Sequence, residues 1–428
     1  MSVIDVVYEG VDGSWVVARA AQQRTETFVE YTDDHLARGL ELAPIRHQNA
    51  DRARTFVGRD VEHLPGLLAD ALPDSWGRLL LRRDMRQHGI EHPGPLQMLT
   101  WLGRRAMGAL AFHPVEGPVA NDRRLVALDR LQDEMLRHLA GEVTRDEAAD
   151  ALTLAAGSGP GGARPKIAVA YTPDGNLIAD NGDDLPPGSE PWMVKFHGPD
   201  DSTHLSTIEA TYLQMAAASG VTVCDHRLLT ASSGTRYLAV RRFDRVAVAD
   251  SRPSRVHMAS AAGLLESYPE YNQHVGYADV IRLTRQVTGD IRDVTEMLRR
   301  AVFNVVAHNR DDHARNTAYL WTPSSGWQLA PAFDLTHSMG PRPTYLADGP
   351  GEHYLDVAGK GKDITREDLR GLSTAAGVKP NDIDEMIDGA LEAVARWASL
   401  ATTNGVPHQV VDQVATRLPA HNLGVSGD

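Results

Sequence analysis

Cysteine is almost absent from this chain of 428 residues, which has only Cys224. A single cysteine cannot form a disulfide within the chain, and it excludes a metal site built from several thiolates. Cys224 lies in the run GVTVCDHRLL, whose apolar residues predict a buried strand, so it is a poor candidate for a catalytic nucleophile. The chemistry of the protein therefore has to come from other side chains.

Long apolar runs and a surplus of positive charge are missing as well. No stretch approaches the ~18 apolar residues that a membrane-spanning helix needs, and the first residues, MSVIDVVYEG, show no basic segment followed by an apolar one. We therefore expect a cytoplasmic protein without a membrane partner. The formal net charge of −14 argues against sequence-independent binding of nucleic acid by the whole chain. The length predicts two or three packed units.

Short strands dominate the predicted amino-terminal part. Residues 1–60 alternate apolar and polar side chains between glycine and aspartate turns, which is typical of antiparallel strands. Helical spacing then covers three stretches, namely residues 64–89 with a break at Pro73, 131–139 and 146–155. We place a β-rich subdomain with helices at residues 1–115.

Strands around one helix make up the predicted middle part, residues 116–243. A glycine-rich bend, GSGPGGARPK, leads into a strand, and two more strands, PWMVKF and RYLAVRRF, flank a helix. Ser206 or Thr207 is predicted to cap this helix, and Gly220 to end it. Residues 244–428 are mostly helical apart from one hairpin, TAYLWTPSSGWQLAPAFDL, so the fold class is α+β.

The hairpin is flanked by residues that suit a metal–phosphate site. Asn316 and Asp334 each lie nine residues from a turn centred near Ser324 and Ser325. If the pairing is regular, these two side chains lie side by side at the open end of the hairpin. One amide oxygen and one carboxylate are a normal protein contribution to a Mg²⁺ site when phosphates supply further ligands.

The stretch NRDDHARN, residues 309–316, adds a carboxylate at the same place. Asp311 lies five residues before Asn316, and an aspartate, an asparagine, a hairpin and a second aspartate follow one another in this order in the catalytic half of protein kinases. In those enzymes the first aspartate accepts the hydroxyl proton. The alternative is that Asp311 and Asp312 cap a helix, or pair with Arg310 and Arg315 on the surface.

A lysine and a glycine-rich bend precede this region. Lys195 lies within the apolar strand WMVKF, where an ammonium group needs an anionic partner such as a phosphate. Glu209 on the following helix is a second candidate partner, as in the lysine–glutamate pair of kinases. The glycines before Lys166 leave backbone N–H groups free to bind an anion. Alternatively, Lys195 points to solvent from an edge strand, and the glycine bend is a flexible linker.

Together these segments resemble the HipA family of toxin serine/threonine kinases from type II toxin–antitoxin modules. The likeness extends over residues 65–335, and it is carried by LPGLLADALPDSWGRLLLRR, GGARPKIAV, WMVKF, IEATYLQMA, YLAVRRFDR, FNVVAHNRDDHARN and LAPAFDL. The resemblance implies a kinase-like fold of two lobes with a β-rich amino-terminal part. It also implies an enzyme that uses ATP and Mg²⁺.

The resemblance assigns roles to particular residues. Asp311 matches the catalytic base, Asn316 and Asp334 match the Mg²⁺ ligands, and Lys195 matches the phosphate-binding lysine. The remaining nucleotide-binding positions are His313 in the catalytic loop, Arg241 to Phe243 in the adenine-binding hinge, and Gly161, Gly162, Ala163 and Arg164 in the loop over the phosphates, followed by Lys166.

The resemblance also implies partners. Members of the family phosphorylate proteins of translation such as aminoacyl-tRNA synthetases, arrest growth, and are neutralised by a helix-turn-helix antitoxin that binds operator DNA. We therefore expect a protein substrate and an antitoxin, with DNA contacted mainly through that antitoxin. Two other readings remain. Asp312, His313, His308 and His337 could form a metal-dependent phosphohydrolase centre, or the chain could be a non-catalytic nucleotide-binding partner of a transcription factor.

Self-inactivation is a further expectation from the family, in which a serine just before the glycine loop is autophosphorylated. Counting back from Lys166, that position is occupied by Gly159, with Ser158 one residue away. The hypothesis is that Ser158 takes the phosphate. Incubation with ATP and Mg²⁺ should then add one phosphate to the intact mass, and this gain should vanish in Ser158→Ala; an unchanged mass of the wild-type chain contradicts it.

Overall fold

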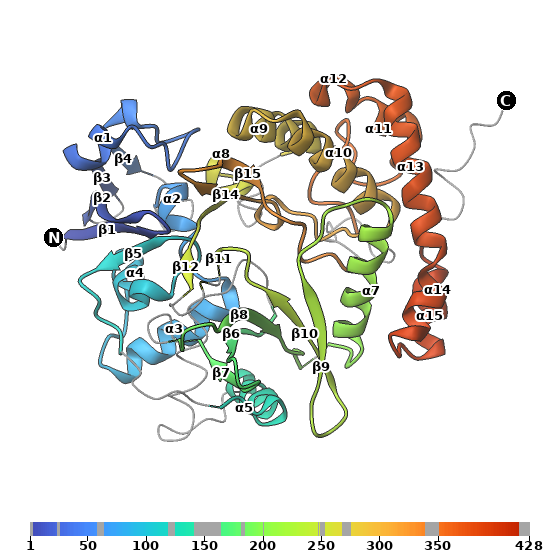
Figure 1. Ribbon diagram of the computed structural model, residues 1–428, viewed down its shortest axis with the longest axis horizontal. Helices are drawn as coiled ribbons and strands as arrows, with labels where there is room; N and C mark the ends of the chain where they lie inside the picture. The colour runs from blue at the N-terminus through green and yellow to red at the C-terminus, as the bar shows by residue number, and fades with distance from the viewer. Residues whose placement is uncertain are drawn as a thin grey trace.

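The computed structural model describes residues 3–23, 26–57, 64–118, 125–140, 164–180, 185–199, 201–246, 248, 253–267, 275–338 and 351–418. The described residues form two five-stranded antiparallel sheets, a three-stranded sheet and a two-stranded one, with helices between them and a set of helices at the carboxy-terminal end. In Figure 1 the first sheet lies at the upper left, the second below the centre, and the last helices along the right-hand side. The predicted α+β class is confirmed.

The first sheet is built from the amino-terminal strands. Its strand order is β4-β3-β2-β1-β5, and the strands are β1 (Val3–Gly10), β2 (Gly13–Gln23), β3 (Glu26–Tyr31), β4 (Ala53–Val57) and β5 (Leu110–His113). Alternate residues of β1 are buried, as expected for a strand with one face on the core. The helices α1 (Asp33–Arg38) and α4 (Pro95–Leu102) belong to the same part.

The predicted helical run over residues 64–89 divides where Pro73 predicted a break. α2 (Gly66–Ala69) precedes it, and α3 (Ser75–Gln87) follows, with Asp74 as its cap through a 2.7 Å hydrogen bond from the Gly77 N–H. A second predicted helix is α5 (Leu128–Ala140), whereas residues 146–155 lie outside the described residues.

The second sheet has the order β7-β6-β8-β10-β9. Its strands are β6 (Lys166–Tyr171), β7 (Leu177–Ala179), β8 (Glu190–Lys195), β9 (His226–Thr230) and β10 (Arg236–Arg241). Helix α7 (Leu205–Ala218) shares a core with Leu238 and Val240 of β10. Tyr237 and Ala239, on the opposite face of the same strand, pack in another cluster. Both faces of this sheet are therefore covered.

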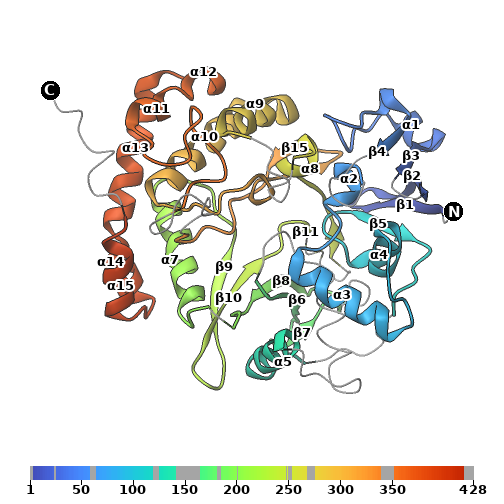
Figure 2. The ribbon, with the colours of Figure 1, turned by 180° about the vertical axis from the view of Figure 1, so that it is seen from behind.

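Helix α3 contributes to that second cluster. Trp76 and Leu80 pack with Leu131 and Met135 of α5 and with side chains of β6 and β8, such as Ile167. α3 lies next to these strands in both ribbon views (Figure 2). A helix from the first 115 residues thus completes the core of the second sheet, and the predicted boundary at residue 115 stays a prediction.

Two local predictions in this region are wrong. α7 begins at Leu205 with His204 as the preceding residue, so Ser206 and Thr207 lie inside the helix rather than cap it. The Thr207 hydroxyl instead donates a 2.6 Å hydrogen bond to the carbonyl of His204. The strand predicted around Cys224 begins only at His226, as β9, so Cys224 lies before it. Cys224 is buried, and its N–H donates a 2.9 Å hydrogen bond to the Ala332 carbonyl.

Beyond residue 243 the chain holds more strands than the sequence predicted. β11 (Arg245–Val246) pairs with β12 (Ser254–Arg255), and β13 (His257–Ser260) extends the predicted hairpin of β14 (Ala318–Thr322) and β15 (Gly326–Leu329). The longer helices are α9 (Tyr277–Thr288), α10 (Ile291–Val306) and α13 (Pro380–Ala395). The shorter ones are α8 (Ala261–Leu265), α11 (Arg366–Arg370), α12 (Ser373–Ala376), α14 (Trp397–Thr403) and α15 (His408–Ala415).

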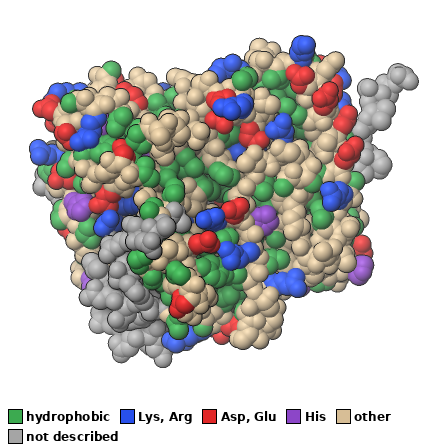
Figure 3. Space-filling model, in the orientation of Figure 1, with side chains coloured by type: hydrophobic (Ala, Val, Ile, Leu, Met, Phe, Trp, Pro, Cys, Tyr) green, Lys and Arg blue, Asp and Glu red, His purple; other side chains and the backbone are tan. Residues whose placement is uncertain are grey.

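Within the described ranges, no helix has the length and apolar character of a membrane span. Charged side chains of both signs are interspersed on the face that Figure 3 shows, so this face presents no broad field of one charge.

The packing of α3 on the second sheet can be tested by replacing single side chains of the helix with alanine. Trp76 is 4% exposed, so Trp76→Ala removes a large buried side chain and should lower the free energy of unfolding by about 3–5 kcal/mol. Leu79 lies on the same helix but is 38% exposed, and Leu79→Ala should cost less than about 1 kcal/mol. Urea unfolding measures both variants, and equal losses would contradict this packing.

Candidate active site

Lys195 lies between two carboxylates at the end of β8. Its ammonium group contacts one carboxylate oxygen of Glu209 on α7 and one of Asp334, which follows the hairpin. Burial opposes the charge of Lys195, but Asp334 and Glu209 outweigh it and raise the pKa of the ammonium group. The prediction that Glu209 pairs with Lys195 is confirmed. The surface reading of Lys195 is wrong, because its side chain is only 15% exposed and is paired with two carboxylates.

Asp334 reaches Lys195 by a route that the sequence did not predict. The hairpin pairs Thr322 with Gly326 and Tyr319 with Leu329, so its midpoint is Ser324. The strand then leaves the hairpin, because the N–H of Ala332 donates a 2.8 Å hydrogen bond to the Thr222 carbonyl. The predicted regular pairing of Asn316 with Asp334 is therefore wrong. Asp334 is held instead by its ion pair with Lys195. Its backbone adopts a left-handed φ of 55°.

The loop that carries Asp311 begins soon after α10 and ends in a short 3-10 helix, Ala314–Asn316. The side-chain amide of Asn316 donates a 2.7 Å hydrogen bond to the Asp311 carbonyl, which ties the two ends of the loop together. The Asp311 side chain is 47% exposed, and its carboxylate lies 3.8 Å from the Nε2 atom of His313. His313, not Asp311, precedes the 3-10 helix, so the helix-capping reading of Asp311 is wrong.

Asp312 faces the opposite way, into the core. Its carboxylate accepts hydrogen bonds from the Tyr277 hydroxyl at 2.6 Å and from the Tyr354 N–H at 2.8 Å, and it lies 2.7 Å from the Nδ1 atom of His353. The surface reading of Asp312 is therefore wrong. Sequence reasoning missed this anchor, because α9 and the segment after residue 351 supply its partners.

Anchoring Asp312 from several sides fixes the backbone of the neighbouring Asp311. The Tyr277 hydroxyl also accepts a 2.9 Å hydrogen bond from Asn304 of α10, so the network reaches a second helix. Since adjacent residues point in opposite directions here, a buried Asp312 leaves the Asp311 carboxylate directed outwards. Arg310, expected on the surface in the alternative reading, is buried as well.

Lys166 lies beside Lys195 in the second sheet, since the two residues are paired in the register of β6 and β8. Its ammonium group forms a 2.8 Å ion pair with Asp74, the cap of α3, and both side chains are buried. Burial raises the pKa of Asp74, and Lys166 opposes that shift. Asp74 is a site residue that sequence reasoning missed. The one feature of the sequence that pointed to it was its position in LPDSWG, where an aspartate at a helix start is expected as a cap.

The glycine-rich loop lies mostly outside the described residues. This applies to Gly161, Gly162, Ala163 and the proposed phosphorylation residue Ser158. Arg164 is described, and its guanidinium group lies 3.6 Å from the carboxylate of Asp201. The assignment of this loop to the phosphates stays a prediction.

A hollow beside Lys195 has the character of a nucleotide pocket. It holds about 430 Å³ of empty space, partly open to solvent, and its lining residues are Met107, Lys166, Met193, Lys195, Val240, Arg241, Arg242, Phe243, Asp244, Phe333 and Asp334. Apolar side chains, including the Phe243 and Phe333 rings 5.4 Å apart, line the same space as the cationic Lys195. An apolar wall with a few polar groups is what a planar base joined to phosphates requires.

The residues suit Mg²⁺ better than a histidine-bound metal. The side-chain oxygen of Asn316 is buried and has no hydrogen-bond partner in the described part of the chain, and Asp334 adds a carboxylate. An amide oxygen and a carboxylate are hard ligands of the kind that Mg²⁺ prefers. The chemistry of these two side chains therefore suits Mg²⁺.

A phosphohydrolase centre finds no support. No group of three histidine, cysteine or acidic side chains that could hold a metal occurs within the described ranges. The Asp312 carboxylate is already engaged in the core by Tyr277, Tyr354 and His353. These groups do not converge as a dinuclear or zinc site requires.

The anchor of the catalytic loop predicts a measurable stability difference. Tyr277→Phe removes one hydrogen-bond donor from the buried Asp312 carboxylate and should lower the free energy of unfolding by about 1–3 kcal/mol. Tyr171 is only partly buried, and its hydroxyl has no hydrogen bond to a described residue. Tyr171→Phe should therefore change the free energy of unfolding by less than about 0.5 kcal/mol. Equal effects in urea unfolding would show that the network does not stabilise the loop.

Comparison with known proteins finds relatives that match most of the chain. At 26% identity, the chain aligns with "Putative kinase Y4mE" of Sinorhizobium fredii over 82% of each chain. At 24% identity, it aligns with "Putative kinase Y4dM" of the same organism over 84% of this chain and 83% of that protein. The HipA of a Shewanella oneidensis complex of HipA, HipB and operator DNA shares the fold, with a TM-score of 0.69, 18% identity, and coverage of 97% of this chain and 95% of that one.

Family models match both parts of the sequence. The HipA N-terminal domain matches residues 10–113, and the HipA-like C-terminal domain matches residues 158–398, more than half of the chain. The second match contains Lys195, Glu209, Asp311, Asn316 and Asp334. The chain therefore belongs to the HipA family.

Proposed function

We propose that this chain is an ATP- and Mg²⁺-dependent serine/threonine protein kinase. The observation that carries the proposal is the convergence of Glu209 and Asp334 on the buried ammonium group of Lys195, at the side of an apolar pocket. A strand lysine paired with a helix glutamate, beside an aspartate that follows a hairpin, is the arrangement that kinases need before phosphoryl transfer. The names of the two Sinorhizobium fredii relatives support the same activity.

We infer a place in the pocket for each part of the nucleotide. Phe243 and Phe333 offer apolar surface to the adenine, and Arg241 to Phe243 form the hinge segment beside it. Lys195 offers its ammonium group to the phosphates, and Lys166 adds a second positive charge on the same wall. A bound nucleotide would replace part of the carboxylate pairing of Lys195 with phosphate oxygens.

Asp311 is the proposed catalytic base. Its half-exposed carboxylate can accept a hydrogen bond from a serine or threonine hydroxyl and orient the oxygen towards the γ-phosphorus. As the new P–O bond forms, the bond to the β-phosphate oxygen breaks, and the hydroxyl proton passes to Asp311. Asn316 and Asp334 would hold Mg²⁺, which would neutralise phosphate charge. His313 lies beside Asp311, with its Nε2 atom 3.8 Å from the Asp311 carboxylate.

The biological setting is also a proposal. The relative from Shewanella oneidensis was solved as a toxin–antitoxin complex with HipB and operator DNA. By analogy, this chain would be a cytoplasmic toxin that arrests growth by phosphorylating a protein, such as an aminoacyl-tRNA synthetase, and is neutralised by a helix-turn-helix antitoxin. Its net charge of −14 agrees with DNA contact mainly through the antitoxin. Autophosphorylation at Ser158 would be its means of self-inactivation.

Transfer of labelled phosphate from ATP tests the enzymatic proposal. Asp311→Asn keeps the size of the side chain but removes the base, so kcat should fall by about 10²- to 10⁴-fold while the Kd for an ATP analogue changes little. Asp412 is exposed on the distant α15, and Asp412→Asn should transfer phosphate at the wild-type rate.

Two outcomes would contradict the proposal. Wild-type transfer by the Asp311→Asn variant would remove Asp311 as the base. Binding of the ATP analogue without any transfer by the wild-type chain, to itself or to proteins of a cell extract, would instead favour a non-catalytic nucleotide-binding protein.

A further inference from the structure

An aromatic side chain lies beside the proposed catalytic base. The ring of Tyr354 meets the ring of His313 edge-on, with 5.4 Å between the ring centroids and 77° between the ring planes. The Nε2 atom of His313 in turn lies 3.8 Å from the Asp311 carboxylate. The His313 side chain is only 10% exposed, so it lies largely covered between its neighbours. Two contacts therefore connect the Tyr354 ring to the base.

Tyr354 is open to solvent at this place. Even with its contacts inside the chain in place, it keeps 39% of its surface exposed, comparable to the 47% of the Asp311 side chain. The residues on either side of it, His353 and Leu355, are both buried. A large aromatic side chain between two buried neighbours is thus available to a molecule that approaches Asp311.

The backbone that carries this ring is held in place. The Tyr354 N–H donates a 2.8 Å hydrogen bond to the carboxylate of Asp312, which also anchors the catalytic loop. The N–H of His353 donates a 2.7 Å hydrogen bond to the Gly361 carbonyl, and Leu355 packs in the core. One buried carboxylate therefore positions both the loop that carries the base and the segment that carries the ring.

The distance between ring and base suits an extended substrate segment. A protein substrate must place a serine or threonine hydroxyl at Asp311, so its neighbouring residues have to lie on the surface around that carboxylate. In an extended segment, side chains two residues apart point to the same side and lie roughly 7 Å apart. The contacts from Asp311 through His313 to Tyr354 cover a distance of this order.

We propose that Tyr354 determines substrate specificity by binding an apolar side chain two residues from the phosphorylated hydroxyl. This inference rests on the proposed kinase activity and names a feature of its protein substrate. An aliphatic or proline side chain that covers the exposed part of the ring removes apolar surface of both partners from water. Because the segment around Tyr354 is fixed before the substrate arrives, binding costs little conformational entropy on the side of the enzyme.

Phosphate transfer from ATP to a peptide library tests the inference. Each peptide has a central serine, and every position around it is fixed in turn as each amino acid. At one of the positions two residues from the serine, the wild-type full chain should prefer leucine, valine or proline to aspartate by at least about fivefold. Tyr354→Ala should reduce this preference to less than about twofold, whereas Tyr354→Phe keeps the ring and should retain it.

Steady-state kinetics on the preferred peptide separates substrate binding from support of the catalytic loop. In Tyr354→Ala, the KM for the peptide should rise about tenfold, with kcat within about threefold and an unchanged KM for ATP. Tyr171→Ala is the matched control, because Tyr171 is a partly exposed tyrosine on β6 of the second sheet, and it should behave as the wild type. Thermal unfolding shows whether each variant is folded.

Several results would overturn the inference and leave the proposed kinase activity intact. These are an unchanged preference in Tyr354→Ala, a loss of preference in Tyr354→Phe, and a wild-type preference for arginine or for acidic residues at these positions. A fall in kcat alone would make Tyr354 a support of the catalytic loop instead. A wild-type chain that labels itself but no peptide would also contradict recognition of an extended segment. Absence of any transfer by the wild-type chain would overturn both proposals.

Discussion

The buried ammonium group of Lys195 is the interaction on which the site depends. An unpaired charge at this depth would cost several kcal/mol, so the lysine requires both Glu209 and Asp334 in place. Those carboxylates come from a helix and from the segment after a distant hairpin. One cation therefore fixes the position of the sheet, of α7 and of the proposed metal ligand at once. Removing one partner of such a buried pair typically costs about 3–5 kcal/mol.

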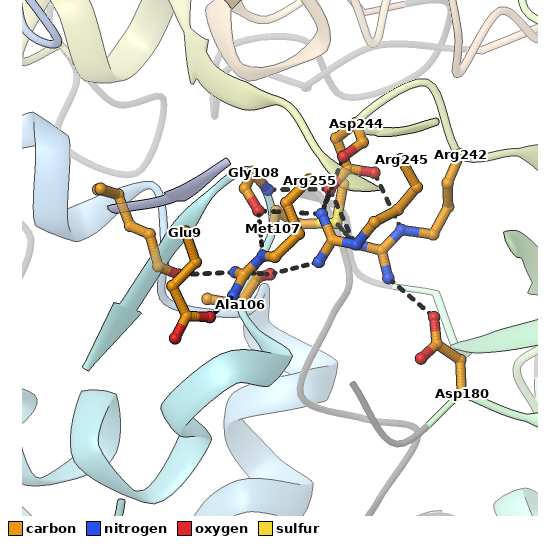
Figure 4. A network of polar contacts seen from close by, with 10 residues as sticks. Glu9, Ala106, Met107, Gly108, Asp180, Arg242, Asp244, Arg245 and Arg255 are labelled. Atoms are coloured by element: carbon orange, nitrogen blue, oxygen red, sulfur yellow. Dashed lines mark hydrogen bonds and ion pairs between the residues drawn. The ribbon is translucent and has the colours of Figure 1, made fainter. Parts of the chain in front are cut away.

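The amino-terminal part belongs to the same site. Asp74 of the α3 cap holds Lys166 next to Lys195, and α3 itself completes the core of the second sheet through Trp76. At the other end of the pocket, Asp244 accepts hydrogen bonds from the Gly108 N–H and from Arg245, and so ties residues 106–108 to the chain that follows β10 (Figure 4). A change in the position of the first sheet would thus reach both lysines and this segment, which gives the amino-terminal part a physical means of influencing the site.

The sequence predicted what local patterns encode. The strands of the first 60 residues, the break near Pro73 and the existence of the hairpin all followed from periodicity and turn residues. The pairing of Lys195 with Glu209 followed from the analogy with kinases. The hairpin register did not, because the strand leaves its partner at Ala332 for a segment more than a hundred residues earlier. Asp74 and the partners of Asp312 were missed for the same reason, since each contact joins segments distant in sequence.

The most direct test of the central claim is a crystal structure of the chain with a non-hydrolysable ATP analogue and Mg²⁺. The account predicts phosphate oxygens at Lys195, the cation between Asn316 and Asp334, and the adenine against Phe243 and Phe333. Nucleotide bound elsewhere, with Lys195 still enclosed by both carboxylates and no phosphate near it, would contradict the account.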